Sequence, residues 1–397
     1  METKNGCHHL IASFEALDDP RSAQHVRYPL MEIIFLTVTA VISGAREWEE
    51  IVDFGQVKLE WLRQYLDFSN GIPSHDTVNR TIGLIDYRAF EKCFLNWATM
   101  TIRLPQGVLI NLDGKKLRSS ATKLEQQTAH AKGGKSAAHI VEAWCGELQL
   151  CLAQCKVANK SNEIIAIPII LDWLEVEGCI ISIDAIGCQY GIAEKIFDKK
   201  ADYILALKEN QENLYKEVTK AFEERTAQMP DAYCDEQSNK GHGRIEKRIC
   251  RVITAPDLEK RELTDKWKGL QHVVEISSER VVMATGEITA EKRYYISSLN
   301  CDAKCFNKLI RGHWAIENQL HWTMDVVFGE DASRKRTRNA AENFALIGRI
   351  GLNMLKGYAD KVSIGRKMNK CAISDSYREK ILETALNKKM ASEPPHT

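Results

Sequence analysis

Residues 105–225 replace helical patterns with short apolar runs, and this alternation restricts the fold more than any other feature. The run at 108–112 is too short for a helix and lies between Gly107 and Gly114, so it predicts a strand. Two alternating runs follow at 137–158, and helical and strand-like runs then take turns. Three strands in a meander, followed by alternating helices and strands, predict a mixed α/β sheet with both faces covered.

Residues 1–103 have helical patterns throughout. The apolar run at 29–44 contains Glu32 and is shorter than the roughly 20 residues that cross a bilayer, so it predicts a buried helix. Ser74 is a good N-cap for a short helix with polar Asn79 and Arg80. This pattern is compatible with a helix-turn-helix, although most such pairs are packing units. We therefore predict an all-helical N-terminal domain over 1–103, with DNA binding as one of its candidate roles.

The rest of the chain divides into three further segments. Strand-like runs at 229–298 predict a β-rich insertion into an α/β domain that covers residues 104–360. Apolar side chains at helical spacing in 309–328 predict one amphipathic helix against the core, with Glu317 on or beside its apolar face. Residues 361–397 are predicted to be a mobile tail.

Charge is balanced over the whole chain but not locally. With 54 basic and 54 acidic residues, the net charge of zero argues neither for nor against a nucleic-acid partner. Basic clusters are what a phosphate backbone requires, and solvated faces are their ordinary alternative. The candidate DNA contacts in such clusters are Lys115, Lys116, Arg118, His242, Arg244, Arg334, Arg336 and Arg338.

Twelve cysteines occur without a Cys-x-x-Cys pair, and several lie in apolar runs. Cysteine behaves there as a small hydrophobic residue, so a reduced protein is the simplest interpretation. We therefore predict a cytoplasmic, nucleoid-associated protein without a membrane partner.

Two carboxylates follow apolar strand runs. Asp113 ends the first predicted strand and Asp184 the fourth, and functional groups of open α/β sheets gather at the carboxyl ends of strands. If these strands are neighbours, the two like charges favour a divalent cation, and oxygen ligands favour Mg²⁺ or Mn²⁺. Glu317 would complete an Asp, Asp, Glu set suited to two-metal phosphoryl transfer.

Two histidines flank this glutamate. His313 and His321 are four residues before and after Glu317, so the three side chains can share one helix face. An ion-paired glutamate on a half-buried helix is the ordinary alternative. A zinc site from these three residues is a further alternative, although their spacing differs from His-Glu-x-x-His and leaves no obvious general base.

Seven motifs occur in an order that one protein family shares. The chain resembles the H-repeat-associated insertion-sequence transposases, members of the DDE superfamily with a ribonuclease-H-like fold. The resembling motifs are FEALDDPRSAQHVRYPL, SHDTVNRTI, LDGKKLR with Asp113, ISIDAIGCQ with Asp184, ADYILALKENQ, GHGRIEKR, and RGHWAIENQLHWTMDVVFGED with Glu317.

The resemblance implies metal-dependent cleavage of DNA at element ends and strand transfer to target DNA. It also implies that Asp113, Asp184 and Glu317 are catalytic and hold Mg²⁺, for which Mn²⁺ substitutes. The implied partners are double-stranded DNA and a second copy in a homodimer. A catalytically silent DNA-binding remnant of a decayed element is the alternative, and the intact carboxylates speak against it.

The chain departs from the family at two positions near the glutamate. Many members carry an arginine four residues before it and a lysine seven after it, where this sequence has His313 and Met324. Candidate phosphate contacts are therefore Arg311, His313, His321 and the basic cluster at 334–338.

Overall fold

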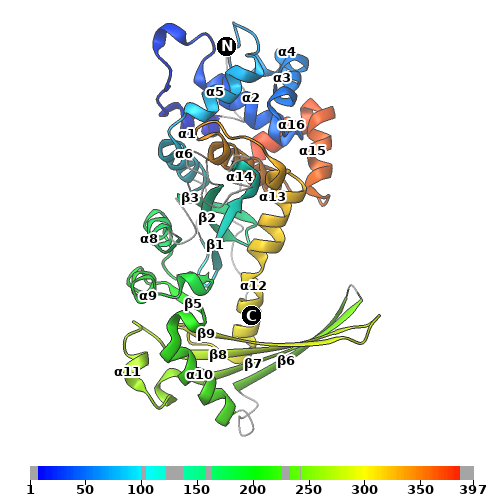
Figure 1. The fold of residues 1–397 in the computed structure, drawn as a ribbon. Coiled ribbons are helices and arrows are strands. Elements are labelled where there is room, and N and C mark those ends of the chain that lie inside the picture. Colours follow the sequence, from blue (N-terminus) through cyan, green and yellow to red (C-terminus); the bar gives the residue numbers. More distant parts are fainter. Residues whose placement is uncertain are drawn as a thin grey trace.

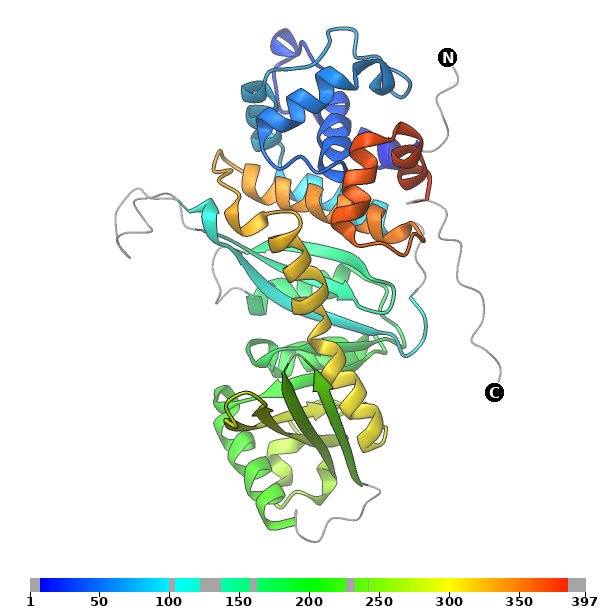
Figure 2. The same cartoon turned by 90° about the vertical axis from the view of Figure 1, so that its right-hand side faces the viewer.

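The molecule is elongated, with helices at one end, a sheet in the middle and a projecting β arm at the other end (Figure 1). The β arm is formed by the strands within residues 234–297. The computed structural model describes residues 8–99, 104–121, 137–157, 163–225, 233–241 and 243–384. Helices from both ends of the chain lie at one end of the molecule, and the β arm projects from the other, as the rotated view also shows (Figure 2).

The N-terminal region is helical, as predicted. Its longest apolar helix is buried along nearly its whole length, which confirms the expectation for residues 29–44. The Ser74 hydroxyl accepts a hydrogen bond from the Thr77 N–H and caps the fifth helix as expected. The helices are α1 (His8–Glu15), α2 (Leu30–Ile42), α3 (Trp48–Val57), α4 (Leu59–Leu62), α5 (His75–Leu84) and α6 (Tyr87–Thr99).

One mixed sheet of nine strands has the order β3-β2-β1-β4-β5-β9-β8-β7-β6. Strands β1, β2 and β3 form the predicted antiparallel meander, while β1, β4 and β5 run parallel. The strands are β1 (Leu109–Leu117), β2 (Ala138–Cys145), β3 (Leu150–Val157), β4 (Ile180–Ile183), β5 (Asp202–Leu207), β6 (Cys234–Gly241), β7 (Arg244–Thr254), β8 (His272–Val282) and β9 (Ile288–Ser297).

Helices cover both faces of the first five strands. The helices on one face are α8 (Glu163–Trp173), α9 (Tyr190–Asp198) and α10 (Glu212–Arg225). They share a buried apolar core with the strands. Helix α12 (Ala303–His313) packs on the other face, against β1, β4, β6 and β7 (Figure 1). This is the ribonuclease-H-like arrangement that the resemblance implies.

The β-rich segment extends this sheet instead of forming a separate one. Strand β9 pairs antiparallel with β5, and β8, β7 and β6 follow; the short helix α11 (Arg261–Thr264) lies between β7 and β8. Three of these strands were predicted, but β6 was not. Its sequence, CDEQSNKG, has no apolar alternation because most of its side chains are exposed or half-buried.

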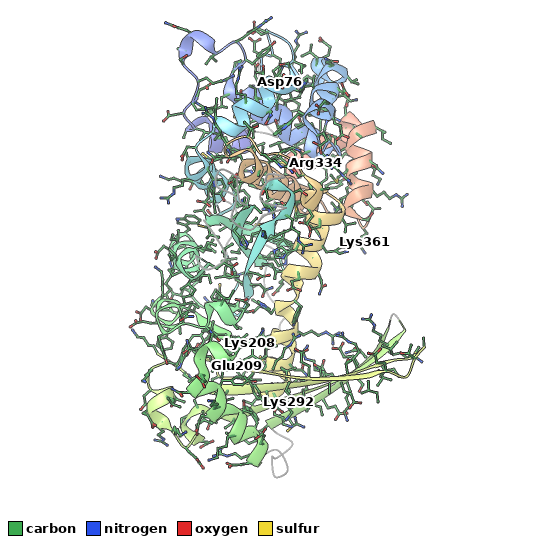
Figure 3. The ribbon with its side chains drawn as sticks, in the orientation of Figure 1. Asp76, Lys208, Glu209, Lys292, Arg334 and Lys361 are labelled. Atoms are coloured by element: carbon green, nitrogen blue, oxygen red, sulfur yellow. The ribbon has the colours of Figure 1, made fainter. Side chains whose placement is uncertain are left out.

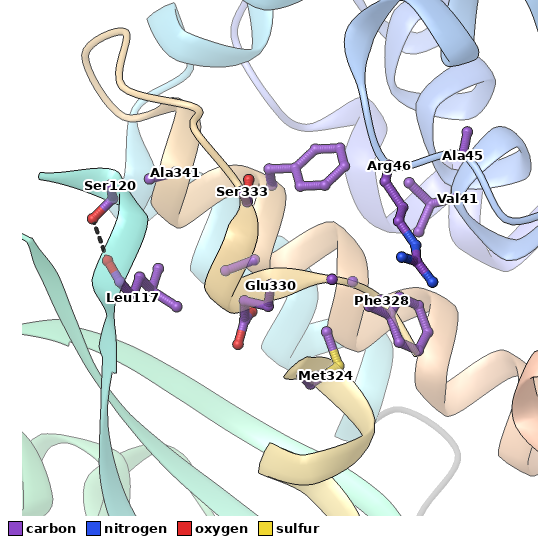
Figure 4. A pocket seen from close by; sticks show the side chains of 14 residues that line it. Val41, Ala45, Arg46, Leu117, Ser120, Met324, Phe328, Glu330, Ser333 and Ala341 are labelled. Carbon is purple, nitrogen blue, oxygen red and sulfur yellow. Dashed lines mark hydrogen bonds between the residues drawn. The ribbon is translucent and has the colours of Figure 1, made fainter. Parts of the chain in front are cut away.

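The C-terminal helices join the helical region to the sheet. They are α13 (Trp322–Val326), α14 (Ala340–Gly357), α15 (Ile364–Ile373) and α16 (Asp375–Thr384). Helix α14 is buried along nearly its whole length and shares one core with α2, β2 and α16. A small cavity of about 30 Å³ remains where this helix meets α2, between Met324, Phe328 and Arg46 (Figure 4).

The prediction of a mobile tail after residue 360 is wrong for residues 364–384. Met368, Cys371 and Leu382 are buried in the shared core, and the Arg378 side chain is fully buried. Its guanidinium donates to the Cys371 carbonyl, which ties α16 to α15. Residues 385–397 lie outside the described part of the chain.

Candidate active site

Asp113 and Asp184 lie at the same level on adjacent parallel strands. Leu112 of β1 pairs with Ile183 of β4, so each aspartate is the next residue along its strand. Strand β4 ends there, whereas β1 continues to Leu117 beside β2. The two strands are therefore neighbours, which is the arrangement that the sequence interpretation required, although the first strand is longer than expected.

Backbone N–H groups hold both carboxylates. The Gly114 N–H donates to Asp113 Oδ1 at 2.8 Å, and the Ile186 N–H donates to Asp184 Oδ1 at 3.1 Å. The Asp113 side chain is 17% exposed, so it reaches solvent only in part. These bonds fix one oxygen of each carboxylate.

Electrostatics link the three predicted acidic residues. Burial raises the pKa of Asp113 to about 6. The nearby His321 opposes this rise, while the negative charges of Asp184 and Glu317 add to it. Asp113 therefore lies within electrostatic range of both other carboxylates.

The helix that carries Glu317 differs from the single amphipathic helix predicted over 309–328. Helix α12 ends at His313, a π-helix covers Ile316–His321, and α13 begins at Trp322. Ile316, Leu320 and Met324 face the core as predicted. The Glu317 side chain is exposed, so no buried cation is needed to hold it.

The His313 side chain is held inside the fold by a hydrogen bond. Its Nδ1 and the Ser182 hydroxyl form a hydrogen bond, and the ring is partly buried. Burial lowers the pKa of His313 to about 4, even though the charge of Asp184 opposes that change. A neutral imidazole could contact a phosphate only as an uncharged hydrogen-bond donor, so the predicted contact at His313 stays a prediction.

His321 joins Asp113 to a buried glutamate. His321 Nε2 lies 3.1 Å from Glu142 Oε2, and its Nδ1 lies 3.8 Å from Asp113 Oδ2. Glu142 is fully buried and stands opposite Asp113 in the β1–β2 ladder. The predicted phosphate contact at His321 is thus an internal bridge with a 12% exposed side chain.

A buried arginine completes this arrangement. Arg349 Nε donates to Glu142 Oε1 at 2.6 Å, and the other end of the guanidinium makes two bonds to Glu330. Burial alone would raise the pKa of Glu142, but Arg349 and His321 hold it well below its usual range. Glu142 therefore remains ionised although it is buried, because it has cationic partners.

Lys115 belongs to the same buried network, so its predicted contact with DNA is wrong. Its ammonium lies 2.6 Å from Asp325 Oδ1 and 2.7 Å from Glu330 Oε2, and the side chain is 7% exposed. Glu142, Glu330 and Arg349 were not among the residues predicted from the sequence. A charged residue inside an apolar strand run or an apolar helix is the signal that could have found Glu142 and Arg349.

The other predicted DNA contacts remain near the surface in the described part of the chain. Arg336 is partly buried and donates from Nε to the Ser119 carbonyl. The exposed residues are Lys116, Arg118, Arg244, Arg311, Arg334 and Arg338 (Arg334 in Figure 3). Arg244 begins β7 in the arm, far along the chain from the other basic cluster. His242 and residues 122–136 lie outside the described residues.

The donor chemistry of the acidic set fits a hard divalent cation, although it forms no closed ligand cage. Among the described residues, no group of three or more His, Cys, Asp or Glu side chains is arranged to hold a metal ion. Asp113 and Asp184 nevertheless lie at one level on adjacent strands, and the repulsion between their charges is what a cation would relieve. The zinc alternative is not supported, because His313 and His321 contact different partners.

Comparisons with known proteins agree with this geometry. Residues 105–354 match the family model described as "Transposase DDE domain", and residues 11–98 match the one described as "DDE_Tnp_1-associated". The chain therefore belongs to the DDE transposase family. In the described ranges, no helix has the length and apolarity needed to cross a membrane.

Relatives match nearly the whole chain. "Putative transposase YncI" of Escherichia coli O157:H7 is 41% identical over 94% of both chains. "H repeat-associated putative transposase YhhI" of Escherichia coli K12 is 39% identical over 96% of this chain and 98% of its own. A solved structure titled "Cryo-EM structure of piggyBac transposase synaptic complex with hairpin DNA (SNHP)" has 9% identity and a TM-score of 0.44. It covers 98% of this chain and 83% of its own, and a likeness of that size carries no argument.

Proposed function

We propose that this protein cleaves DNA strands at the ends of its insertion sequence and joins the freed ends to target DNA. The observation that carries the proposal is the placement of Asp113 and Asp184 at one level on adjacent parallel strands, within electrostatic range of Glu317. Members of this family generally use divalent metal ions. The three carboxylates are the residues that would hold Mg²⁺, with Mn²⁺ as its substitute.

Bound Mg²⁺ would polarise the phosphodiester and lower the pKa of an attacking water. The protein's own part is to hold its carboxylates in place. The Gly114 N–H fixes one oxygen of Asp113, while Glu142 holds His321 against the other. Cleavage and joining are both in-line displacements at phosphorus, so one site serves a water in the first step and a 3′-hydroxyl in the second.

DNA binding would use the exposed basic residues around this site. Lys116 and Arg118 follow Asp113 on β1 and the turn after it, and Arg118 is 78% exposed. Arg311 lies on α12, just before the π-helix that carries Glu317. Such contacts neutralise phosphates and position the duplex without reading its sequence. A homodimer fits this role, because two element ends must be cut and joined.

The test is cleavage of labelled duplex DNA that carries the element's own ends, in Mg²⁺ or Mn²⁺. Wild-type protein is compared with Asp113→Asn, Asp184→Asn and Glu317→Gln. We expect the wild type to cleave and each variant to lose at least about 10³-fold in rate, equal to about 4 kcal/mol of transition-state stabilisation. Unchanged circular dichroism and end binding would show that these variants are folded.

Two outcomes would overturn the proposal. Metal-dependent cleavage by Asp184→Asn at the wild-type rate would remove the carboxylate site from the reaction. Specific end binding without cleavage by the wild type, in either metal, would favour the silent DNA-binding remnant instead.

A further inference from the structure

A pocket of about 450 Å³ adjoins Asp184 at the edge of the candidate active site. Ala185 and Ile186, which directly follow Asp184, form part of its lining. Helix α10 contributes Tyr215, and the chain just after β5 contributes Lys208. The pocket therefore shares a wall with the turn that positions a predicted catalytic carboxylate.

A cavity forms here because strand β9 is longer than its neighbour β5. The ladder between β5 and β9 ends at the pair Leu207 and Tyr294. Strand β9 begins six residues before that pair, at Ile288, and its pairing with β8 covers this earlier part. The β arm therefore extends beyond the end of β5. The pocket lies between the residues that follow β5 and the part of β9 that β5 does not cover. Figure 3 shows Lys208, Glu209 and Lys292 close to one another where the arm leaves the sheet.

The pocket has an aromatic wall. Tyr215 is partly exposed, and its ring meets Tyr294 edge to face, with centroids 5.6 Å apart and planes at 81°. Tyr294 is buried, so it holds the Tyr215 ring in place from behind. An aromatic ring fixed at the wall of a cavity is a platform on which a nucleobase can stack.

The rim is mixed in charge, but its acidic groups are partly neutralised. Lys208 and Lys292 are exposed on this rim together with Glu209 and Glu291. Arg293 makes two hydrogen bonds to Glu291, at 2.7 Å and 2.9 Å. Lys292 lies 3.3 Å from the buried Glu275. Lys208 is exposed and directly follows Leu207, the last residue of β5. Its ammonium is therefore available at the strand end where a phosphate would approach.

We propose that this pocket binds one unpaired nucleotide of the DNA strand whose phosphodiester lies at Asp113 and Asp184. The base stacks on Tyr215, and Lys208 faces the adjoining phosphate. The volume lies within the range of small-ligand sites, and a paired base cannot enter because it remains inside the duplex. This inference rests on the proposed DNA cleavage function, because it specifies the form of the DNA substrate.

The test measures stacking without cleavage. Duplex DNA with the element's end sequence carries a short single-stranded extension containing 2-aminopurine, whose fluorescence falls when the base stacks. We expect wild-type protein to quench this fluorescence and to bind the extended duplex more tightly than a blunt one. Tyr215→Ala should lose the quenching and about tenfold in affinity for the extended duplex only, since stacking one base contributes about 1–3 kcal/mol.

Matched variants separate the pocket from general effects. Tyr215→Phe keeps the ring and should behave as wild type. Lys208→Glu changes an exposed side chain, so it should fold normally and still weaken binding of the extension; Lys361→Glu is the control at another exposed lysine (Figure 3). Equal quenching by wild type, Tyr215→Ala and Lys208→Glu would overturn the proposal, and so would equal losses on blunt and extended DNA.

The experiment also distinguishes the two proposals. It needs no metal and no cleavage, so a silent DNA-binding remnant would still quench the extension if the pocket binds it. Cleavage by wild type without any quenching would reject the pocket and leave the proposed function standing.

Discussion

Charged side chains are paired with opposite charges on the buried side of Asp113, whereas carboxylates cluster on its open side. On the buried side, Glu142 and Glu330 share the guanidinium of Arg349, and each charge has a partner of opposite sign. On the open side, burial raises the pKa of Asp113, and the negative charges of Asp184 and Glu317 add to that rise although His321 opposes it. The difference shows which charges the protein satisfies by itself and which need something from outside.

This contrast has a physical reading. Buried charges cost several kcal/mol each unless they are paired, so the network around Arg349 can persist only because it is complete. Clustered carboxylates of one sign oppose folding, and proteins keep them mainly where a ligand uses them. The buried side therefore positions Asp113, while the open side is the part that we propose to meet metal and DNA.

The largest expected effect comes from breaking the buried side. Arg349→Leu leaves Glu142 and Glu330 buried without their shared cation, so the free energy of unfolding should fall by about 3–5 kcal/mol. Urea denaturation followed by circular dichroism measures this loss. Arg366→Leu, at an exposed position of α15, is the matched control and should change stability by less than about 0.5 kcal/mol. If both variants lost the same small amount of unfolding free energy, the buried charges would not depend on Arg349, and the contrast between the two sides of Asp113 would be wrong.

A smaller effect of opposite sign is expected on the open side. Asp113→Asn removes a carboxylate whose pKa is raised to about 6 in the fold from 3.8, so its charged form opposes folding. The variant should be more stable than wild type by about 3 kcal/mol at pH 7.5 with chelator present.

The pH dependence checks the sign of this effect. Between pH 4 and 6 the folded wild type binds a proton more tightly than the unfolded chain, so wild-type stability falls as pH rises through this window. The advantage of Asp113→Asn should therefore be complete above about pH 6 and vanish below about pH 4. A variant less stable than wild type at pH 7.5 would mean that the protein already satisfies this charge.

The smallest effect concerns the exposed basic residues. Arg334→Ala should weaken DNA binding about threefold in low salt and reduce the slope of log affinity against log salt by about 0.9, the value for one lost phosphate contact. Fluorescence anisotropy over a series of salt concentrations measures both quantities. Arg63→Ala, at an exposed arginine of the N-terminal region, should leave the slope unchanged. An unchanged slope for Arg334→Ala would remove this residue from the DNA surface.

The strands and helices that carry the site could be predicted from the sequence, because the patterns that indicate them lie within short segments. Apolar runs predicted the strands, and Asp113 and Asp184 were predicted to follow two of them; that these two strands are neighbours is shown only by the structure. The N-terminal helices and the buried run at 29–44 followed from periodicity in the same way.

The side-chain contacts of the site could not be predicted, because they join residues that are distant in the sequence. Lys115 belongs to a basic run, yet its ammonium is held by Asp325 and Glu330, more than two hundred residues away. Burial lowers the pKa of His313, whose ring is hydrogen-bonded to Ser182 on the distant strand β4. Local composition cannot report such contacts, because a charged side chain has the same pattern whether it faces water or a distant partner.

The π-helix at Ile316–His321 has a consequence for how this region can vary. Each added or removed residue in a helix turns everything beyond it by about 100°, because an α-helix has 3.6 residues per turn. Deleting Asn318 would remove no predicted ligand, yet it would rotate His321 and Asp325 away from Asp113 and Lys115. Single-residue deletions in this segment should therefore be as damaging as the loss of a proposed catalytic carboxylate, whereas single substitutions at the exposed Asn318 should be tolerated.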